Sequence, residues 1–588
     1  MCGIFGIQSP NKRINIEKIC SIANKTLNHR GPDDRNIWFN SQTGLSHNRL
    51  SIVDVKNAQQ PMVSLNGRYV IIYNGEIVNF KDLQKNYLPN VKLKTKSDTE
   101  VLIELYSKFG SVMLKYIKGM YAFAIYDKLT KKFFLARDHI GIKPLYYFKK
   151  NDLFAFSSEI KAFYTTNIKN FEIEKENINE FLVHGTIFGK KTLHKNVNEL
   201  KPGHYLVGSS KSIKIFKYWD VSEVRKNEKK NLHDTIRLIQ TNFEKIIEEW
   251  CISDVKIGSL LSGGIDSTYI STIASKYKKV DMFTNYFPDR KNQFSEVSLA
   301  SIVARSTQNK HYKVKVKDDF SNTNIEKLVT HLSDPIQDLN SLSFMALCKY
   351  IKSTTNTKVI LSGEGADELY AGYDRHYKIA RNYEKTKNFD DILFSMNYLS
   401  SNRLKFFFDT NYNLTKERKK IKKDLDKKNF DALKKVLLHD QKTFLPGYLD
   451  RVDKISMMYG LEMRTPFLDE RLISIANMCD SKFKTKKING NIFRKFILRK
   501  IFQKNVSKKI VWNKNKYQFT FPDSESFKNG ALNILYRDLI NKNSEITKYF
   551  KFEKLLGLIN HHEKGFADHS NLLGRLLTFE LFSKLKFR

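Results

Sequence analysis

The chain has 588 residues, too many for one ordinary hydrophobic core, and this length predicts two domains. Hydrophobic residues make up 41% of the sequence and aromatic residues 13%, which argues against a mainly disordered chain. The formal net charge of +39 suggests nucleic-acid binding, but the surplus Lys is spread along the whole chain instead of concentrated on one element. We therefore expect solvated surface charge and no nucleic-acid partner.

The apolar runs and the cysteines indicate in which cell compartment the protein is expected. No apolar run approaches the ~20 residues that span a bilayer, and the amino terminus lacks the pattern of a secretory signal. The five cysteines are scattered and form no C-x-x-C pair, which argues against a disulfide framework or a zinc knuckle. We expect a cytoplasmic protein with no membrane partner.

The first part of the chain, to about residue 208, has the alternating pattern of short β-strands. One helix interrupts them, because Ser97 and Glu100 have the S-x-x-E spacing of a capping box and an apolar run at helical spacing follows. A turn at 128–131 predicts a hairpin between the last two strands. The expected strands are 44–51, 68–73, 120–127 and 132–137.

From about residue 232 strands alternate with helices, which argues for a parallel, doubly wound sheet. The charged stretch 221–232 has no apolar periodicity and is the expected linker, so the expected domains are 1–208 and 232–588. The chain beyond about residue 375 is helix-rich. The expected strands are 256–261, 280–287, 311–316 and 358–361, with helices at 267–277 and 295–307.

The hexamer Ser-Gly-Gly-Ile-Asp-Ser at 262–267 lies where a buried strand is expected to turn into a helix. Gly263 and Gly264 let the backbone curl so that N–H groups face an anion, and the helix amino terminus adds positive potential. Asp266 could hold a magnesium ion that bridges phosphate oxygens. A tight turn with a helix cap explains the glycines but not the whole hexamer, so we favour a phosphate site.

A second glycine loop, Ser-Gly-Glu-Gly-Ala-Asp-Glu at 362–368, follows another buried strand at 359–361. Two such loops at the carboxyl ends of parallel strands would line one crevice, the usual ligand position in open α/β sheets. The sequence therefore predicts an ATP site between the two loops.

Cys2 becomes the first residue if Met1 is removed, which places a thiol and a free α-amine on one residue. An α-amine with a pKa near ~8 can act as the base for its own side chain. For Cys2 taken alone, a buried structural cysteine at the start of a strand over 3–7 is the simpler explanation.

Five other motif residues make a nucleophilic Cys2 the better interpretation. Asn74 and Gly75 follow a strand, and they predict either a type I′ hairpin turn or the donors of an oxyanion hole. Arg49 could clamp a substrate α-carboxylate bidentately. Glu76 and Asp98 could hold the α-ammonium, although Asp98 is equally well explained as a helix-dipole partner.

Together these motifs resemble the glutamine-hydrolysing asparagine synthetase family over nearly the whole chain. The resemblance to its class II glutaminase domain rests on 2–6, 29–33, 49–54, 73–77, 137–138, 141–146 and 158–162. The resemblance to its synthetase domain rests on 262–267, 362–368 and 461–469. We expect 461–469 to be a structural loop that leads into a helix, and we assign it no chemistry.

The resemblance implies an α+β amino-terminal nucleophile glutaminase domain, a β-sandwich covered by helices, followed by an α/β doubly wound parallel-sheet synthetase domain with a helical carboxyl-terminal part. It implies that glutamine forms a thioester at Cys2 and that ammonia passes through an internal tunnel. ATP would activate aspartate as a β-aspartyl-adenylate, releasing pyrophosphate, and ammonia would displace AMP. Because family members are often dimers, a homodimer is one expectation. The glutamine-binding residues implied are Arg49, Asn74, Gly75, Glu76 and Asp98.

For the second domain the resemblance implies further roles. Glu364 would promote formation of the intermediate, Asp367 would join Asp266 in binding magnesium, and Lys495 would neutralise developing phosphate charge. Lys495 lies in a cationic stretch, 494–500, so a solvated helix face explains it equally well. The pyrophosphate-binding residues would be Ser262, Gly263, Gly264, Asp266 and Ser267, and the other nucleotide contacts Leu261, Asn285, Ser362 and Gly363.

The acceptor region departs from the family pattern. Residues 333–338, Ser-Asp-Pro-Ile-Gln-Asp, lack the Asp-Glu-Pro that many relatives carry there. Aspartate is the expected acceptor, and a sugar uronate or a peptide carboxylate is the alternative. A glutaminase joined to a sugar-phosphate module would lack the hexamer at 262–267, and a cyclising synthetase would lack Cys2.

Overall fold

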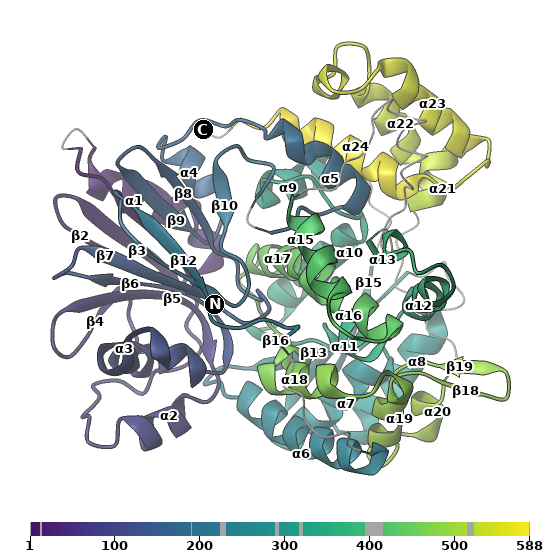
Figure 1. The fold of residues 1–588 in the computed structure, drawn as a ribbon, viewed down its shortest axis with the longest axis horizontal. Coiled ribbons are helices and arrows are strands. Elements are labelled where there is room, and N and C mark those ends of the chain that lie inside the picture. The colour runs from purple at the N-terminus through teal and green to yellow at the C-terminus, as the bar shows by residue number, and fades with distance from the viewer. Residues whose placement is uncertain are drawn as a thin grey trace.

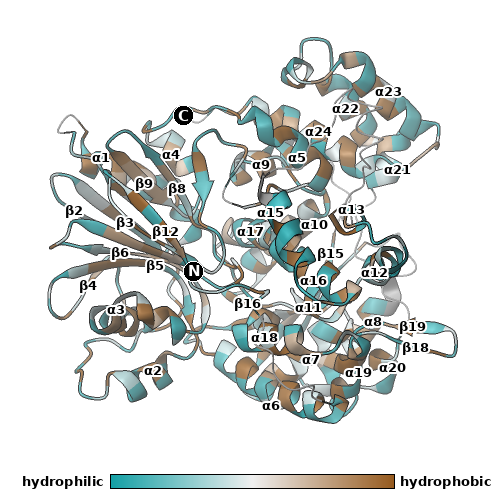
Figure 2. Ribbon diagram, viewed as in Figure 1, coloured by the Kyte–Doolittle hydropathy of each residue, from teal (hydrophilic) through white to brown (hydrophobic). Residues whose placement is uncertain are grey.

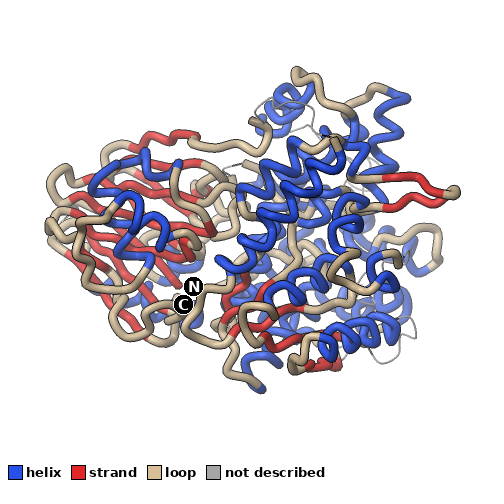
Figure 3. Tube along the Cα trace, turned by 90° about the horizontal axis from the view of Figure 1, so that it is seen from below, coloured by secondary structure: helices blue, strands red, loops and turns tan. Residues whose placement is uncertain are grey.

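The computed structural model describes residues 2–11, 14–189, 191–223, 231–287, 293–316, 321–393, 416–513 and 523–586. Antiparallel strands dominate the chain to residue 217, and helices surround a parallel sheet beyond it (Figures 1 and 3). This architecture confirms the fold class expected from the sequence. Most of the expected linker at 221–232 lies outside the described residues.

The amino-terminal half is a sandwich of two six-stranded antiparallel sheets (Figure 1). Apolar residues of both sheets form one core between them, among them Ile4 and Leu45 from the first and Ile72 and Ala122 from the second. Figure 2 shows apolar stretches along the strands of the sandwich. The first sheet runs β10 (Val197–Glu199), β8 (Tyr146–Lys150), β9 (Leu153–Ser157), β1 (Cys2–Gln8), β3 (Thr43–Arg49), β2 (Asp34–Phe39), and the second β12 (Ile213–Lys217), β11 (His204–Gly208), β7 (Lys132–Arg137), β6 (Gly119–Asp127), β5 (Tyr69–Ile77), β4 (Met62–Val63).

Helices cover both outer faces of the sandwich. α1 (Ile16–Thr26) and α4 (Lys161–Thr165) pack on the first sheet, and α2 (Phe80–Tyr87) and α3 (Asp98–Phe109) pack on the second. The Ser97 side chain caps α3 by accepting a hydrogen bond from the Glu100 N–H, which confirms the predicted capping interaction. The hairpin between β6 and β7 is confirmed too, with Asp127 paired to Lys132.

The carboxyl-terminal half is built on a five-stranded parallel sheet. α6 (Leu232–Trp250), α7 (Ile265–Ala274) and α8 (Gln293–Ser306) contribute to one core cluster, and α9 (Asn322–Leu332), α10 (Asn340–Thr354) and α24 (Ser570–Ser583) to the other. The sheet is therefore doubly wound, as expected. Its strand order is β15 (His311–Lys315), β14 (Val280–Tyr286), β13 (Ile257–Leu260), β16 (Val359–Leu361), β17 (Glu462–Arg464).

The edge strand β17 corrects one sequence-based expectation. Residues 461–469 were expected to form a loop, but Glu462 to Arg464 pair with β16 in parallel register. A three-residue strand is too short for a periodic signal, and β16 lies far away in the sequence.

The remaining helices support this sheet or lie outside it. No helix among the described residues combines the length and the apolarity that crossing a membrane requires. The other elements are α5 (Ile178–His184), α11 (Ala366–Tyr370), α12 (Asp374–Thr386), α13 (Asp390–Leu393), α15 (Lys416–Asp426), α16 (Ala432–Lys442), α17 (Phe444–Met457), α18 (Glu470–Met478), β18 (Lys486–Ile488), β19 (Asn491–Phe493), α19 (Phe496–Phe502), α20 (Lys508–Val511), α21 (Asp523–Asn529), α22 (Ala531–Leu539) and α23 (Phe552–Glu563).

Candidate functional site

Cys2 begins β1 and lies beside Asn74. The main-chain nitrogen of Cys2 is 2.8 Å from Asn74 Oδ1. Because this nitrogen is a donor, the amide atom that faces it must be the carbonyl oxygen. The other amide atom, Asn74 Nδ2, is buried and has no hydrogen-bond partner among the described residues. Asn74 therefore holds an unused donor close to the cysteine.

Asn74 and Gly75 lie inside β5 and not in a hairpin turn. They pair with Ala122 and Tyr121 of β6 in a continuous antiparallel register, which excludes the turn that this dipeptide also predicted. A Cβ atom at Gly75 would lie 2.1 Å from the Met120 carbonyl oxygen, so the strand pair admits only glycine there.

The Arg49 side chain is held by the loop that it faces. Its guanidinium donates to the carbonyl oxygens of Val53 (3.1 Å), Asp54 (2.8 Å) and Val55 (2.9 Å). Arg49 lines the same small cavity as Cys2. These three bonds fix the guanidinium, and a substrate carboxylate would have to use its remaining N–H groups.

Glu76 and Asp98 bring two carboxylates to the Cys2 cavity. Asp98 is in the first turn of α3, and its Oδ2 accepts from Tyr73 Oη (2.9 Å) and from the Ile77 N–H (3.0 Å). Glu76 Oε1 is buried without a hydrogen-bond partner in the described part of the chain. Burial raises the pKa of both carboxyl groups, so a bound cation would stabilise their charged form.

The Cys2 thiol is not activated by its surroundings alone. Burial raises its pKa, and a main-chain hydrogen bond from Leu50 and the charge of Arg49 offset this only in part. The sulfur therefore needs a base to become a thiolate. Removal of Met1 would turn the Cys2 nitrogen into an α-amine, already within hydrogen-bonding distance of Asn74 Oδ1.

Two residues of the carboxyl-terminal half belong to this site and were not predicted. Glu462 of β17 lines the Cys2 cavity. Arg464, at the end of β17, donates from Nη2 to Glu76 Oε2 at 3.1 Å. The only sequence signal was their position in the family-like run 461–469, which does not indicate what they contact.

A second cavity, of about 370 Å³, lies at the carboxyl ends of β13, β14 and β16. The loop after β13 and the loop after β16 both line it, as the two glycine motifs predicted. All of the residues expected to contact ATP or magnesium come together here: Leu261, Ser262, Gly263, Gly264, Asp266, Ser267, Asn285, Ser362, Gly363, Glu364, Asp367 and Lys495.

The first glycine loop has the geometry of an anion cradle. Gly263 has φ +71°, and a Cβ atom there would lie 2.6 Å from the Glu296 carbonyl oxygen. The hydroxyls of Ser262 and Ser267 are 3.0 Å apart and tie the loop to the first turn of α7. The amino terminus of α7 thus faces the cavity, where its N–H groups favour phosphate.

Lys495 is buried between two carboxylates and does not lie on a solvated helix face. Its Nζ is ion-paired with Asp266 and lies 2.7 Å from Asp367 Oδ1. Burial lowers the pKa of Lys495, but the two aspartates more than offset this and hold it above its usual value. Asp266 Oδ1 has no partner among the described residues, so the pair offers oxygen ligands of the kind that magnesium takes.

Glu364, in the second glycine loop, lines this cavity. Shielding from solvent raises the pKa of its carboxyl group, and a hydrogen bond with Tyr448 opposes the rise. A raised pKa favours the protonated form of a carboxyl group, so Glu364 is suited to exchange a proton.

A larger cavity of about 410 Å³ lies between the two halves of the chain. Asp334, Pro335 and Gln337 of the acceptor segment line it. Arg451 lines both this cavity and the cavity at the two glycine loops, and its Nη1 donates to Asp338 Oδ2 at 2.7 Å. Arg451 therefore connects the segment 333–338, which departs from the family pattern, to the cavity at the glycine loops.

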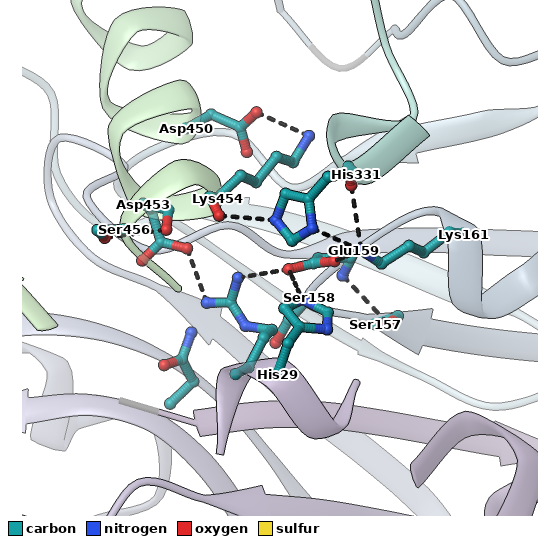
Figure 4. Close-up of polar contacts among 12 residues, drawn as sticks. His29, Ser157, Ser158, Glu159, Lys161, His331, Asp450, Asp453, Lys454 and Ser456 are labelled. Atoms are coloured by element: carbon teal, nitrogen blue, oxygen red, sulfur yellow. Dashed lines mark hydrogen bonds and ion pairs between the residues drawn. The ribbon is translucent and has the colours of Figure 1, made fainter. Parts of the chain in front are cut away.

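His29, Glu159 and His331 form a cluster at the junction of the halves (Figure 4). Their ligand atoms are close enough for a metal ion, but Glu159 is already paired with Arg30 (2.8 Å) and Lys161 (2.8 Å). A divalent cation would meet both positive charges. We therefore assign the cluster to the contact between the halves.

Comparison with known proteins adds the family context. A family model described as a glutamine amidotransferase domain matches residues 1–219, and one described as asparagine synthase matches residues 238–584. The protein named asparagine synthetase [glutamine-hydrolyzing] 1 of Bacillus subtilis is 27% identical, over 100% of this chain and 97% of its own length. Asparagine synthetase [glutamine-hydrolyzing] 3 of the same organism is 29% identical over 80% of each chain.

Similarity to a solved structure is weaker. The glutamine phosphoribosylpyrophosphate amidotransferase from B. subtilis, complexed with ADP and GMP, is 16% identical and covers 62% of this chain and 81% of its own. Its TM-score of 0.29 is too low to carry an argument.

Proposed function

We propose that this chain, which belongs to the glutamine-hydrolysing asparagine synthetase family, converts glutamine, aspartate and ATP into asparagine, glutamate, AMP and pyrophosphate. The family membership makes it a glutamine-dependent ligase. We call its amino-terminal half the glutaminase half and its carboxyl-terminal half the synthetase half. The finer assignment to aspartate is supported by the relatives named asparagine synthetase. The scheme of two sites is supported by the two cavities, one around Cys2 and one around the two glycine loops.

In the glutaminase half, Cys2 Sγ would attack the carboxamide carbon of glutamine. The α-amine of Cys2 would take the thiol proton and then give it to the departing ammonia, leaving a thioester. Asn74 Nδ2, which is buried and unpartnered among the described residues, would donate to the tetrahedral oxyanion. Water would then hydrolyse the thioester and release glutamate, while Arg49 and the cavity acids hold the amino-acid end.

In the synthetase half, a β-carboxylate oxygen of aspartate would attack the α-phosphorus of ATP and displace pyrophosphate. The amino terminus of α7 and the first glycine loop would hold the pyrophosphate. Asp266 and Asp367 would hold a magnesium ion, which neutralises phosphate charge when bound. Ammonia would then attack the acyl carbon of the adenylate and release AMP, with Glu364 placed to exchange a proton.

Ammonia must cross between the halves to link the two reactions. Leu50, Met120 and Ile142 of the glutaminase half belong to the same apolar cluster as Leu361 at the edge of the nucleotide site. A neutral molecule crosses an apolar region at lower cost than a charged one. This continuity supports an internal path for ammonia and disfavours its release to solvent.

The single observation that carries the proposal is the Asn74 amide, whose oxygen accepts from the Cys2 nitrogen and whose Nδ2 has no partner in the part of the chain that the structure describes. The test is pyrophosphate release with glutamine and ATP, screened over carboxylates. We expect aspartate to support release and asparagine to appear in equal amount. Release with a sugar uronate or a peptide carboxylate, and none with aspartate, would contradict the acceptor assignment while leaving the ligase class intact.

A further inference from the structure

Arg464 is the most completely bound charged side chain next to the Cys2 cavity. It is fully buried, and its guanidinium donates to four groups. Nε reaches Glu462 Oε1 at 2.6 Å, and Nη1 reaches the carbonyl oxygens of Trp250 (2.8 Å) and Ile252 (2.7 Å). Nη2 reaches Glu76 Oε2 at 3.1 Å, across the boundary between the halves. Its orientation is therefore fixed from several sides.

The backbone of Arg464 is fixed by the nucleotide-binding sheet. Arg464 is paired with Leu361 of β16, and its carbonyl oxygen accepts from the Ser362 N–H at 2.8 Å. Ser362 begins the second glycine loop, which lines the nucleotide cavity. Arg464 thus contacts both sites. Its main chain bonds Ser362 at the start of the nucleotide-binding loop, and its side chain bonds the Glu76 carboxylate of the glutamine site.

The buried carboxylate of Glu76 needs a cationic hydrogen-bond donor beside it. It is only 3% exposed, and burial raises the pKa of its carboxyl group, whereas the charge of Arg464 lowers it. Arg464 bonds only Oε2, so Oε1 keeps its capacity to accept a hydrogen bond. A buried carboxylate without a cation becomes protonated and loses its ability to attract an ammonium group.

We propose that Arg464 is a positioning residue of the glutamine site, which orients Glu76 from the synthetase half and supplies the cation that favours its charged form. This inference rests on the proposed glutaminase function of the Cys2 cavity. Arg464 acts through Glu76 and does not itself line the cavity. The glutamine site is therefore complete only when the two halves are docked, and Glu462 of the same strand supplies part of its wall.

The test is the kinetics of glutamine hydrolysis by the full-length Arg464→Gln protein over a range of pH. We expect KM for glutamine to rise about 10- to 100-fold with a smaller change in kcat, because a charge-assisted contact of the substrate is weakened. The acidic limb of kcat/KM should move to higher pH, because Glu76 loses the cation that lowers its pKa. Synthesis from free ammonia should stay near the wild-type rate.

Two further variants separate positioning from folding. Arg464→Lys keeps the charge, so we expect the acidic limb of kcat/KM to return toward its wild-type position, with a smaller rise in KM. If Arg464→Gln does not fold, Arg464→Lys provides the test. Arg471→Gln is the matched control, since Arg471 pairs with Asp469 and Glu249 and does not line the Cys2 cavity. Its KM for glutamine should match that of the wild type.

Either of two outcomes would overturn the inference about Arg464 and leave the proposed function intact. One is an unchanged KM and pH profile in Arg464→Gln, and the other is an equal loss of glutamine-dependent and ammonia-dependent synthesis in this variant. If the wild-type protein hydrolyses no glutamine, the proposed function fails, and the inference fails with it.

Discussion

At the scale of single residues, Asn74 makes the most specific contribution to the Cys2 site. Its side-chain oxygen accepts from the Cys2 nitrogen, so the amide cannot turn away without breaking a buried hydrogen bond. That contact fixes the orientation of Nδ2. Because this donor is already in place, the site does not have to reorganise when negative charge develops on the substrate.

The variant Asn74→Asp isolates this donor, because it keeps an oxygen for the Cys2 nitrogen and replaces Nδ2 by a second acceptor. We expect kcat for glutamine hydrolysis to fall about 10²- to 10³-fold, as for the loss of one oxyanion-hole donor. Steady-state glutamate release measures it. Asn48→Asp is the matched control, since Asn48 is equally buried but lies outside the Cys2 cavity. An unchanged kcat in Asn74→Asp would contradict the assignment.

Residues in short local motifs were predictable from the sequence. The two glycine loops predicted where Asp266 and Glu364 lie, because each loop directly follows a buried strand whose direction fixes its position. Lys495 was ambiguous, because a cationic stretch is compatible with both a solvated face and a buried ion pair. Arg464 could not be assigned, because its contact with Glu76 joins segments that are adjacent only in the folded chain.

At the scale of elements, β3 carries a buried titratable group that makes stability depend on pH. His47 is 1% exposed, its Nε2 bonds the Tyr73 carbonyl oxygen at 3.1 Å, and burial lowers its pKa to about 3. The folded protein therefore keeps His47 neutral down to low pH, whereas the unfolded chain protonates it below its ordinary pKa of 6.5. Stability must fall as the pH decreases from 6.5 toward 3, because the unfolded state binds the additional proton.

The variant His47→Gln removes this titration. Between pH 6.5 and 4.5 we expect the wild type to lose about 2 kcal/mol more unfolding free energy than His47→Gln, near the ~1.4 kcal/mol per pH unit of one proton. Urea unfolding followed by circular dichroism measures both proteins under the same conditions. All other groups titrate alike in the two chains, so parallel pH dependences would contradict the prediction.

The element that the sequence described least well is β17. Its neighbours β13, β14 and β16 were predictable as buried apolar runs between helices, whereas β17 contains two charged residues among three. Those charges are tolerated because Arg464 donates hydrogen bonds both to Glu462 and to Glu76 of the other half. The strand is therefore stabilised by contacts that no local pattern contains.

At the scale of the whole molecule, buried ion pairs join the two halves. Arg30, which is fully buried, bonds Glu159 at 2.8 Å in its own half and Asp453 at 2.7 Å in the other. The Arg30 Nε also donates to the Cys2 carbonyl oxygen at 3.1 Å. Docking of the halves and the position of the nucleophile therefore depend on the same guanidinium.

The variant Asp453→Ala tests this dependence. It leaves Arg30 and the buried Lys143 without their shared carboxylate, which costs about 3–5 kcal/mol for a broken buried pair. We expect calorimetry to show an earlier transition for the glutaminase half, separated from that of the synthetase half. The exposed pair of Glu172 with Lys195 offers the control, because Glu172→Ala should leave the melting curve unchanged. A single transition at the wild-type temperature in Asp453→Ala would contradict this account of docking.

The protein is expected to carry out two reactions at two separate sites, and ammonia is the only reactant that passes between them. The most direct test measures asparagine formation by Cys2→Ala with either glutamine or ammonium chloride as the nitrogen source, in the presence of aspartate and ATP. We predict no product with glutamine and a wild-type rate with ammonia, because the nucleotide cavity contains no part of the Cys2 site. Persistent product from glutamine, or loss of synthesis from both sources, would contradict the two-site scheme.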